Sequence, residues 1–311
     1  MGFLSGSPDA EEEVVEPAGT NRLADVTILL AGCGDLGTES GLRFAAAGHR
    51  VVGWRRSPSK LPPEIEGVAA DLGSPDLPRV PADTTAVVVA VAADSPTESA
   101  YRTAYLDGLS HVLDALERDS VVPRRVLFVS STAVYGDAGG GWIDESTTAA
   151  PGSFSGRVLL EAEGLLADRL RGTSSTAVAL RLGGIYGPAR TRLIDQVRAG
   201  SAVIPDVSHY TNRIHRDDAA GVIVRVCTMA KEPSPVYLGV DDEPAELGDV
   251  LRFLAGELGL DDPPTADAGA ARGGNKRCSN ALLRATGYTF RYPTFREGYR
   301  DVLAGAGLRH P

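Results

Sequence analysis

Three glycines near the start of the chain have the spacing of a phosphate-binding turn. They lie in Gly32-Cys33-Gly34-Asp35-Leu36-Gly37, which fits the pattern G-x-G-x-x-G. Glycine at the first position permits a sharp turn, at the second it lets backbone N–H groups approach a pyrophosphate, and at the third it lets a helix pack closely on a strand. The free N–H groups and the positive dipole end of a following helix favour anions. The pattern therefore predicts dinucleotide binding, with a plain tight turn as the alternative.

The segments around this turn have the required order of strand, turn and helix. Residues 26–31 form a nearly continuous apolar run, typical of a strand buried on both faces of a parallel sheet, and residues 38–47 have the composition of a helix. Further strands are predicted at residues 49–54, 67–71, 85–92, 126–129 and 177–182, with long helices at 98–118 and 157–170. This alternation predicts an α/β fold with a doubly wound parallel sheet, the Rossmann fold.

Two arginines follow the second predicted strand. Arg55 and Arg56 lie about 20 residues beyond the glycines, where NAD-binding folds carry an acidic residue that accepts hydrogen bonds from the ribose hydroxyls. A guanidinium can instead clamp the 2′-phosphate of NADP with paired hydrogen bonds. The sequence therefore favours NADP(H) over NAD(H), with NAD(H) still possible and a solvated basic turn as the alternative.

The rhythm of strands and helices changes after Gly183. Shorter elements are predicted there: helices at 217–229, 247–258, 280–285 and 294–303, and a strand at 236–238. We therefore divide the chain into a disordered acidic tail (1–24), a dinucleotide-binding Rossmann domain (25–183) and mainly a small C-terminal substrate lobe (184–311). Residues 266–274, rich in Gly, Ala and Arg, are predicted to form a mobile loop.

The composition excludes several classes of protein. Of 311 residues, 43% are hydrophobic and 23% charged, as in ordinary globular proteins. Five acidic residues of the predicted tail precede the first basic residue, Arg22, so the rest is only mildly acidic and predicts neither nucleic-acid nor membrane partners. Three scattered cysteines argue against a disulfide framework and a metal site. No signal peptide or membrane-length apolar run is recognisable, so we expect a cytoplasmic protein.

Longer motifs carry a resemblance to a known family. They are Asp71-Leu72, SSTAVYGD at residues 130–137, LRLGGIYGP at 180–188 and NRIHRDDAA at 212–220. From about residue 28 to the C-terminus the chain resembles the short-chain dehydrogenase/reductase superfamily, in its extended, NAD(P)-dependent epimerase/dehydratase form. The resemblance implies a substrate-facing hydroxyl at Ser131. It also implies cofactor contacts at Asp71, Leu72, Ala90, Ala92 and Gly184.

The usual catalytic pair of that family is absent from its expected place. Family members use Tyr-x-x-x-Lys, in which the lysine lowers the pKa of the tyrosine. Alignment through Gly156 and Glu163 puts Ser155 at the tyrosine position and Leu159 at the lysine position. Tyr105 falls where the family often carries asparagine. The chain thus resembles an atypical member that has lost its proton-transfer pair.

Another group must then move the proton if the protein is an enzyme. Ser131 is retained, Tyr135 and Tyr186 follow strand ends where ligands gather in such sheets, and His215 can titrate near neutral pH. Each has a structural alternative: packing for the tyrosines, a hydrogen-bonded core position for the histidine and a turn for the serine.

Two functions are consistent with these patterns. The first is an NADP(H)-dependent oxidoreductase or epimerase, with a non-standard acid or base, acting on a small carbonyl, hydroxyl or sugar-nucleotide-like substrate. The second is a non-catalytic NADP(H)-binding sensor or partner-binding module. By analogy with the family, residues 98–118 and 157–170 would form a homodimer interface.

Overall fold

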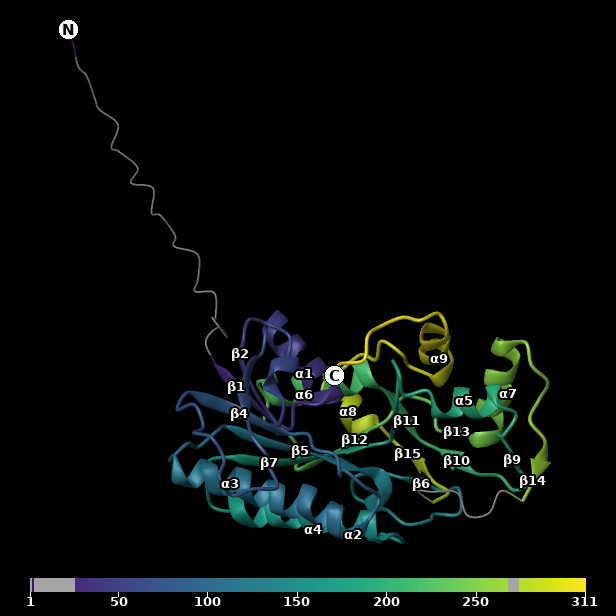
Figure 1. Ribbon diagram of the computed structural model, residues 1–311, viewed down its shortest axis with the longest axis horizontal. Helices are drawn as coiled ribbons and strands as arrows, with labels where there is room; N and C mark the ends of the chain where they lie inside the picture. The colour runs from purple at the N-terminus through teal and green to yellow at the C-terminus, as the bar shows by residue number, and fades with distance from the viewer. Residues whose placement is uncertain (1, 3–25, 268–273) are drawn as a thin grey trace.

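A seven-stranded parallel sheet forms the centre of the molecule (Figure 1). The computed structural model describes residues 2, 26–267 and 274–311; apart from residue 2 the predicted tail, and most of the predicted mobile loop, lie outside the described residues. The strands, in their order across the sheet, are β12 (Val236–Gly239), β7 (Thr176–Leu182), β5 (Arg125–Ser131), β4 (Thr84–Val89), β1 (Thr27–Ala31), β2 (Arg50–Arg55) and β3 (Glu66–Ala69). The predicted α/β fold with a doubly wound parallel sheet is confirmed.

Helices cover both faces of this sheet (Figure 1). Helices α1 (Asp35–Ala46) and α6 (Arg216–Thr228) lie together on one face, and α3 (Gly108–Arg118) and α4 (Phe154–Leu170) lie on the other. Strands β1 and β4 are almost entirely buried between these helices, which is why each reads as an apolar run rather than an alternating one.

Strand β1 shows how the two faces are divided. Ile28 and Leu30 belong to the core on the side of α1 and α6, where they join Phe44. Leu29 and Ala31 belong to the core on the side of α3 and α4. Successive side chains of a strand point to opposite faces, so a single five-residue strand anchors both cores.

The helix predicted at residues 98–118 is one helical run with a change of winding in it. It consists of α2 (Glu98–Tyr101), the π-helical segment η2 (Arg102–Asp107) and α3. The run begins at Thr97, whose side chain accepts a hydrogen bond from the N–H of Ala100. A π-helical turn rotates the side chains that follow it, and such turns are frequent at functional sites.

A smaller lobe lies beyond the carboxyl end of β7. Its core joins α5 (Arg192–Arg198), α7 (Leu247–Leu258) and α9 (Phe295–Leu303), and α8 (Ala281–Arg284) lies against β12. Short paired strands complete it: β8 (Gly184–Tyr186) with β11 (Arg213–His215), β10 (Tyr210–Thr211) with β13 (Ala245–Glu246), β9 (Ile204–Pro205) with β14 (Thr265–Ala266), and β6 (Trp142–Ile143) with β15 (Arg277–Cys278). Single 3₁₀ turns η1 (Pro58–Lys60) and η3 (Thr132–Val134) follow β2 and β5.

The predicted boundary at residue 183 does not separate the sheet from the lobe. β12 pairs with β7 at the edge of the main sheet, and α6 packs on α1, although both come from residues 184–311. Conversely β6, from residues 25–183, pairs with β15. The chain therefore returns to the sheet after entering the lobe. Among the described residues, no helix has both the length and the apolarity that a membrane crossing requires.

Candidate functional site

The glycine-rich turn has the geometry that its sequence predicts. Gly32 has φ +92°, and a Cβ there would lie 2.6 Å from the carbonyl oxygen of Ala90. A Cβ on Gly37 would lie 2.6 Å from the carbonyl oxygen of Gly32, so the helix could not pack so closely on the turn. A Cβ on Gly34 would meet no protein atom within 4 Å. The first and third glycines are thus required by the fold, whereas the second leaves open space.

The start of α1 presents backbone N–H groups beside that open space. The first intrahelical hydrogen bond runs from the N–H of Thr38 to the carbonyl of Gly34 at 2.7 Å. The N–H groups of Asp35, Leu36 and Gly37 precede it and are not used by the helix. Gly34 caps the helix without a side chain. The turn therefore fits an anionic diphosphate, which would bind the bare amides and the positive end of the helix dipole.

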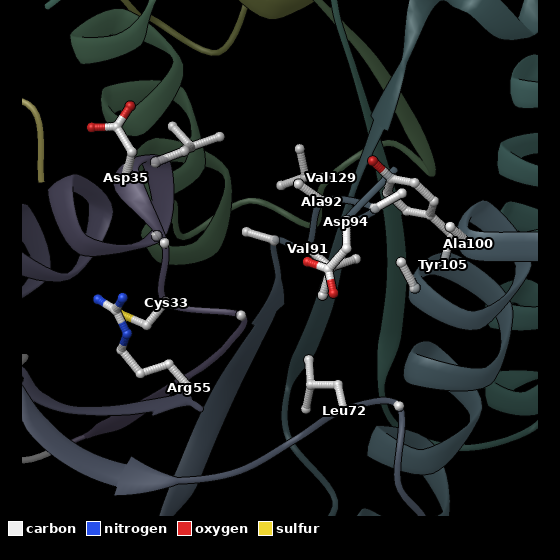
Figure 2. A pocket seen from close by; sticks show the side chains of 18 of the residues that line it. Cys33, Asp35, Arg55, Leu72, Val91, Ala92, Asp94, Ala100, Tyr105 and Val129 are labelled. Atoms are coloured by element: carbon white, nitrogen blue, oxygen red, sulfur yellow. The ribbon is translucent and has the colours of Figure 1, made fainter. Parts of the chain in front are cut away.

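A cleft of about 1270 Å³ opens at the carboxyl ends of the strands (Figure 2). Its lining comes from the turn (32–37), the ends of β2, β3 and β4 with the residues that follow them (54–57, 70–73 and 90–95), the ends of β5 and β7 (129–131 and 182–183), and residues 99–100 and 103–105 of the helical run. Small-molecule pockets usually measure about 300–1,000 Å³, so this one is large enough for an extended ligand. Ligands of open α/β sheets bind at this edge.

The cofactor contacts implied by the family resemblance lie in this cleft, with one exception. Asp71, Leu72, Ala90 and Ala92 line it together with the glycine-rich turn. Gly184 does not: it pairs with β11 on the lobe side, and its neighbours Gly183 and Ile185 line the cleft instead. Successive residues of an extended segment face opposite ways, so the cleft is lined by the neighbours of Gly184 and not by Gly184 itself.

Asp35 is neutralised by two arginines from the second half of the chain. Arg190 Nε lies 2.8 Å from Asp35 Oδ2, and Arg216 Nη1 lies 3.0 Å from Oδ1. The N–H of His310 donates to the same Oδ1 at 3.1 Å. Burial by itself would raise the pKa of Asp35, but these hydrogen bonds and positive charges lower it overall. The carboxylate stays ionised without adding an unpaired negative charge to the anion-binding turn.

Both arginines predicted to bind a 2′-phosphate line the cleft and already have partners. Arg55 Nη1 donates to the backbone oxygen of Pro311 at 2.9 Å. Arg56 forms a two-point ion pair with Asp94, with nitrogen–oxygen distances of 2.8 and 2.9 Å. Figure 2 shows Arg55 beside Cys33 at one side of the cleft and Asp94 nearer the middle.

Ser131 lies in the cleft at the end of β5. Its Oγ accepts a hydrogen bond from the N–H of Ala133 at 3.1 Å, which caps the 3₁₀ turn η3. A hydroxyl has one hydrogen and two lone pairs, so this bond leaves the O–H of Ser131 able to donate to a ligand oxygen. The predicted hydroxyl therefore lies in the cleft and also caps the turn, and its contact with a substrate stays a prediction.

A buried polar network supports the strand end that carries Ser131. Ser130 Oγ donates to Glu163 Oε1 at 2.5 Å. Arg181 binds the same carboxylate through Nε at 3.0 Å and Nη2 at 2.6 Å, and its Nη1 donates to the Tyr135 hydroxyl at 2.6 Å. Both side chains of the ion pair are less than 10% exposed. Each group has a partner, so the network fixes β5 against α4 and β7.

The structure does not bring Tyr135 to the cleft. Its ring packs in the core on the side of α3 and α4, only 3% exposed. The hydroxyl donates to the carbonyl of Asp144 at 3.1 Å and accepts from Arg181, so its hydrogen is already used. Burial raises the pKa of Tyr135 despite the nearby guanidinium. This is the packing role named as its alternative.

Tyr186 and His215 also lie away from the cleft, in the lobe. Tyr186 stacks on Tyr299, with ring centroids 4.4 Å apart, and burial raises its pKa. His215 contacts Tyr292 at 4.1 Å between ring centroids, and its Nδ1 accepts from the N–H of Asp217 to cap α6. Burial lowers the pKa of His215 to about 4, so the ring is neutral at physiological pH.

A tyrosine hydroxyl in the cleft was not among the predicted proton donors. Tyr105 lines the cleft from the π-helical segment η2 (Figure 2). Its ring packs against Tyr101 and Phe128, at 5.2 and 6.2 Å between centroids. Burial raises its pKa to about 12, although a backbone hydrogen bond from Ala93 acts the other way. The only hint in the sequence was that Tyr105 stands where the family often carries asparagine. The π-helical segment that contains Tyr105 could not be recognised from the sequence.

The two positions aligned with the family's Tyr-x-x-x-Lys pair differ in their surroundings. Leu159 lines the cleft with an almost fully buried side chain. Ser155 lies outside the lining, with its Oγ 3.0 Å from that of Ser153 at the start of α4. Within the described chain, no three His, Cys, Asp or Glu side chains are grouped as a metal would need.

Comparisons with known proteins agree with this architecture. The model of the NAD-dependent epimerase/dehydratase family matches residues 28–238. Protein YeeZ of Escherichia coli K12 is 26% identical over 281 residues, which are 86% of this chain and 96% of YeeZ. A solved structure from Methylobacillus flagellatus, named after the same family, is 38% identical with a TM-score of 0.73, covering 90% of this chain and 98% of that one.

A more distant structure shares the fold. Human epimerase family protein SDR39U1 (isoform 2), solved with NADPH, is 19% identical with a TM-score of 0.74, and the match covers 89% of this chain and 99% of the human one.

Proposed function

Because the chain belongs to the NAD-dependent epimerase/dehydratase family, we propose that it binds NADP(H) in the cleft and catalyses oxidation–reduction or epimerisation of a small carbonyl, hydroxyl or sugar-nucleotide-like substrate. The observation that carries the proposal is the glycine-rich turn. Gly34 leaves open space in front of the unused amides of α1, as a diphosphate requires. The cofactor in the human structure of the same fold is NADPH, which agrees with the two arginines after β2.

Two hydroxyl groups in the cleft are our candidates for the chemistry. When bound, a nicotinamide supplies or accepts a hydride. Ser131 at the end of β5 and Tyr105 in η2 both line the cleft, and they would donate hydrogen bonds to the substrate oxygen and hold it in place. A tyrosine with a pKa of about 12 is protonated at neutral pH, so Tyr105 can give a proton to an oxygen that gains negative charge.

The apolar side chain of Leu159 supports a second candidate function. If it occupies the place of the catalytic lysine, no ammonium lowers the pKa of a nearby phenol, and proton transfer is slow. A protein with an intact dinucleotide cradle and weak proton transfer would serve as an NADP(H)-binding sensor or partner-binding module.

Thermal-shift titrations with NADPH, NADP⁺, NADH and NAD⁺, followed by NADPH oxidation with a panel of carbonyl compounds, test both functions. Turnover supports the enzyme, stabilisation without turnover supports the sensor, and no stabilisation by any dinucleotide removes both. For the enzyme we expect Ser131→Ala and Tyr105→Phe each to lower turnover by about 100-fold while NADPH still binds. Ser155→Ala and Tyr101→Phe, outside the cleft lining, are the matched controls and should leave turnover unchanged.

A further inference from the structure

An ion pair crosses the predicted cofactor cleft. Arg56 directly follows β2, and Asp94 lies in the loop after β4. In the sheet β1 lies between these two strands, and the glycine-rich turn leaves from the end of β1. The pair therefore joins the loop after β2 to the loop after β4, across the end of β1. Both residues line the same cleft as the turn.

The contact uses the groups of Arg56 that a phosphate would need. Nη1 and Nη2 each donate to one oxygen of Asp94, at 2.8 and 2.9 Å. A phosphate is held by an arginine in the same two-point manner, so carboxylate and phosphate require the same N–H groups. The hydrogen bond from Arg56 lowers the pKa of Asp94, so the carboxylate is ionised at neutral pH.

The pair is exposed enough to exchange partners. The side chains of Arg56 and Asp94 are 64% and 71% exposed. Exposed ion pairs of this kind contribute little to stability, because water competes for both charges. A dianionic phosphate brings more charge than a carboxylate and can displace it, but it must overcome both the existing pair and the repulsion from Asp94.

We propose that Asp94 is a specificity-determining residue, which competes with the 2′-phosphate of NADP(H) for the guanidinium of Arg56 and so limits the preference for NADP(H) over NAD(H). The inference rests on the proposed binding of a dinucleotide in this cleft. NAD(H) has no 2′-phosphate and leaves the pair between Arg56 and Asp94 intact. Removal of the carboxylate therefore affects the phosphorylated cofactor alone.

The test measures dissociation constants of NADPH and NADH, by fluorescence titration of the full-length protein, for wild type, Asp94→Asn, Arg56→Ala and the double variant. Asp261→Asn removes one exposed carboxylate outside the cleft and controls for net charge. We expect Asp94→Asn to bind NADPH about two- to fivefold more tightly and NADH unchanged. In the Arg56→Ala background, which binds NADPH more weakly, the added Asp94→Asn change should have no effect.

Three results would overturn the inference while the proposed function stands. Asp94→Asn binding NADPH more weakly would mean that Asp94 orients Arg56 rather than competing for it. Unchanged binding would mean that the two anions do not compete. A gain that persists without Arg56 would mean plain repulsion of the phosphate. If wild type binds neither dinucleotide, the proposed function falls and the inference falls with it.

Discussion

The glycine-rich turn permits a substitution that separates binding from folding. Gly34→Ala adds one methyl group at a position where no protein atom lies within 4 Å, and the φ of −85° at Gly34 suits alanine. Alanine is a poorer helix cap than glycine, which lowers the stability of the folded state. It also reduces the conformational entropy of the unfolded chain, which raises the stability by about 0.4–1 kcal/mol, so the two effects oppose each other. We therefore expect the free energy of unfolding to change by less than about 0.5 kcal/mol.

Dinucleotide binding should respond much more strongly to the same methyl group. It fills the space through which a diphosphate reaches the N–H groups of Asp35, Leu36 and Gly37. Hydrogen bonds to a charged group contribute about 1.5–3 kcal/mol each, so losing one of them weakens NADPH binding by about 10- to 100-fold. Fluorescence titration with NADPH measures the binding, and urea unfolding measures the stability.

Gly37→Ala is the matched control because its methyl group points into the protein. Its Cβ would lie 2.6 Å from the carbonyl oxygen of Gly32, and we expect about 1–3 kcal/mol of destabilisation from the forced movement of backbone. Wild-type affinity for NADPH in Gly34→Ala would refute the reasoning, because the diphosphate would then not approach the turn. A large loss of stability in Gly34→Ala would contradict the observation that a methyl group at this position contacts no protein atom.

Three further variants test charged and titratable groups, one in the cleft and two in buried positions outside its lining. Arg55→Glu should weaken NADPH binding by about tenfold or more relative to NADH. An unchanged ratio of the two dissociation constants in parallel titrations would exclude binding of the 2′-phosphate by Arg55. His215→Asn keeps a capping side chain on α6 but removes a group whose pKa falls from 6.5 to about 4 on folding. Below pH 6.5 only the unfolded state binds that proton, so wild type should lose up to about 3 kcal/mol more stability than the variant between pH 6.5 and 4; parallel urea curves would contradict this. Glu163→Gln leaves Arg181 buried without a countercharge and should cost about 3 kcal/mol in urea unfolding, whereas a loss below about 1 kcal/mol would mean that water reaches the network.

The fold could be predicted because its signals are local. Parallel strands covered on both faces are mostly apolar, and β1 and β4 have no polar residue beyond the threonines at their start. The helix predicted at residues 247–258 matches α7 (Leu247–Leu258), where the apolar spacing is strong and Gly259, in the left-handed conformation, ends it. The domain boundary was harder to predict from the sequence, since the position of β12 depends on its pairing with β7, which lies far from it in the sequence.

The proton donors were harder to predict because proximity to a strand end does not fix direction. Ser131 and Tyr135 are four residues apart after the same strand, yet the 3₁₀ turn η3 between them leaves one in the cleft and sends the other into the core. Tyr186 follows a sheet strand in sequence, but β8 has already left the sheet for its pairing with β11. Tyr105 reaches the cleft through a π-helical turn, which has no clear sequence signature.

Asp35 shows how the distant parts of the chain complete the local motif. An acidic residue in the first turn favours a helix dipole, but beside a diphosphate it would repel the ligand. Arg190, from the loop after β8, and Arg216, from α6, bring two positive charges against its one negative charge. Arg216 is further held by Asp217 at 2.7 Å, whereas Arg190 also lines the cleft. The lobe loop therefore contributes to the charge of the cofactor site, and a rearrangement of that loop on substrate binding would alter the anion-binding turn directly.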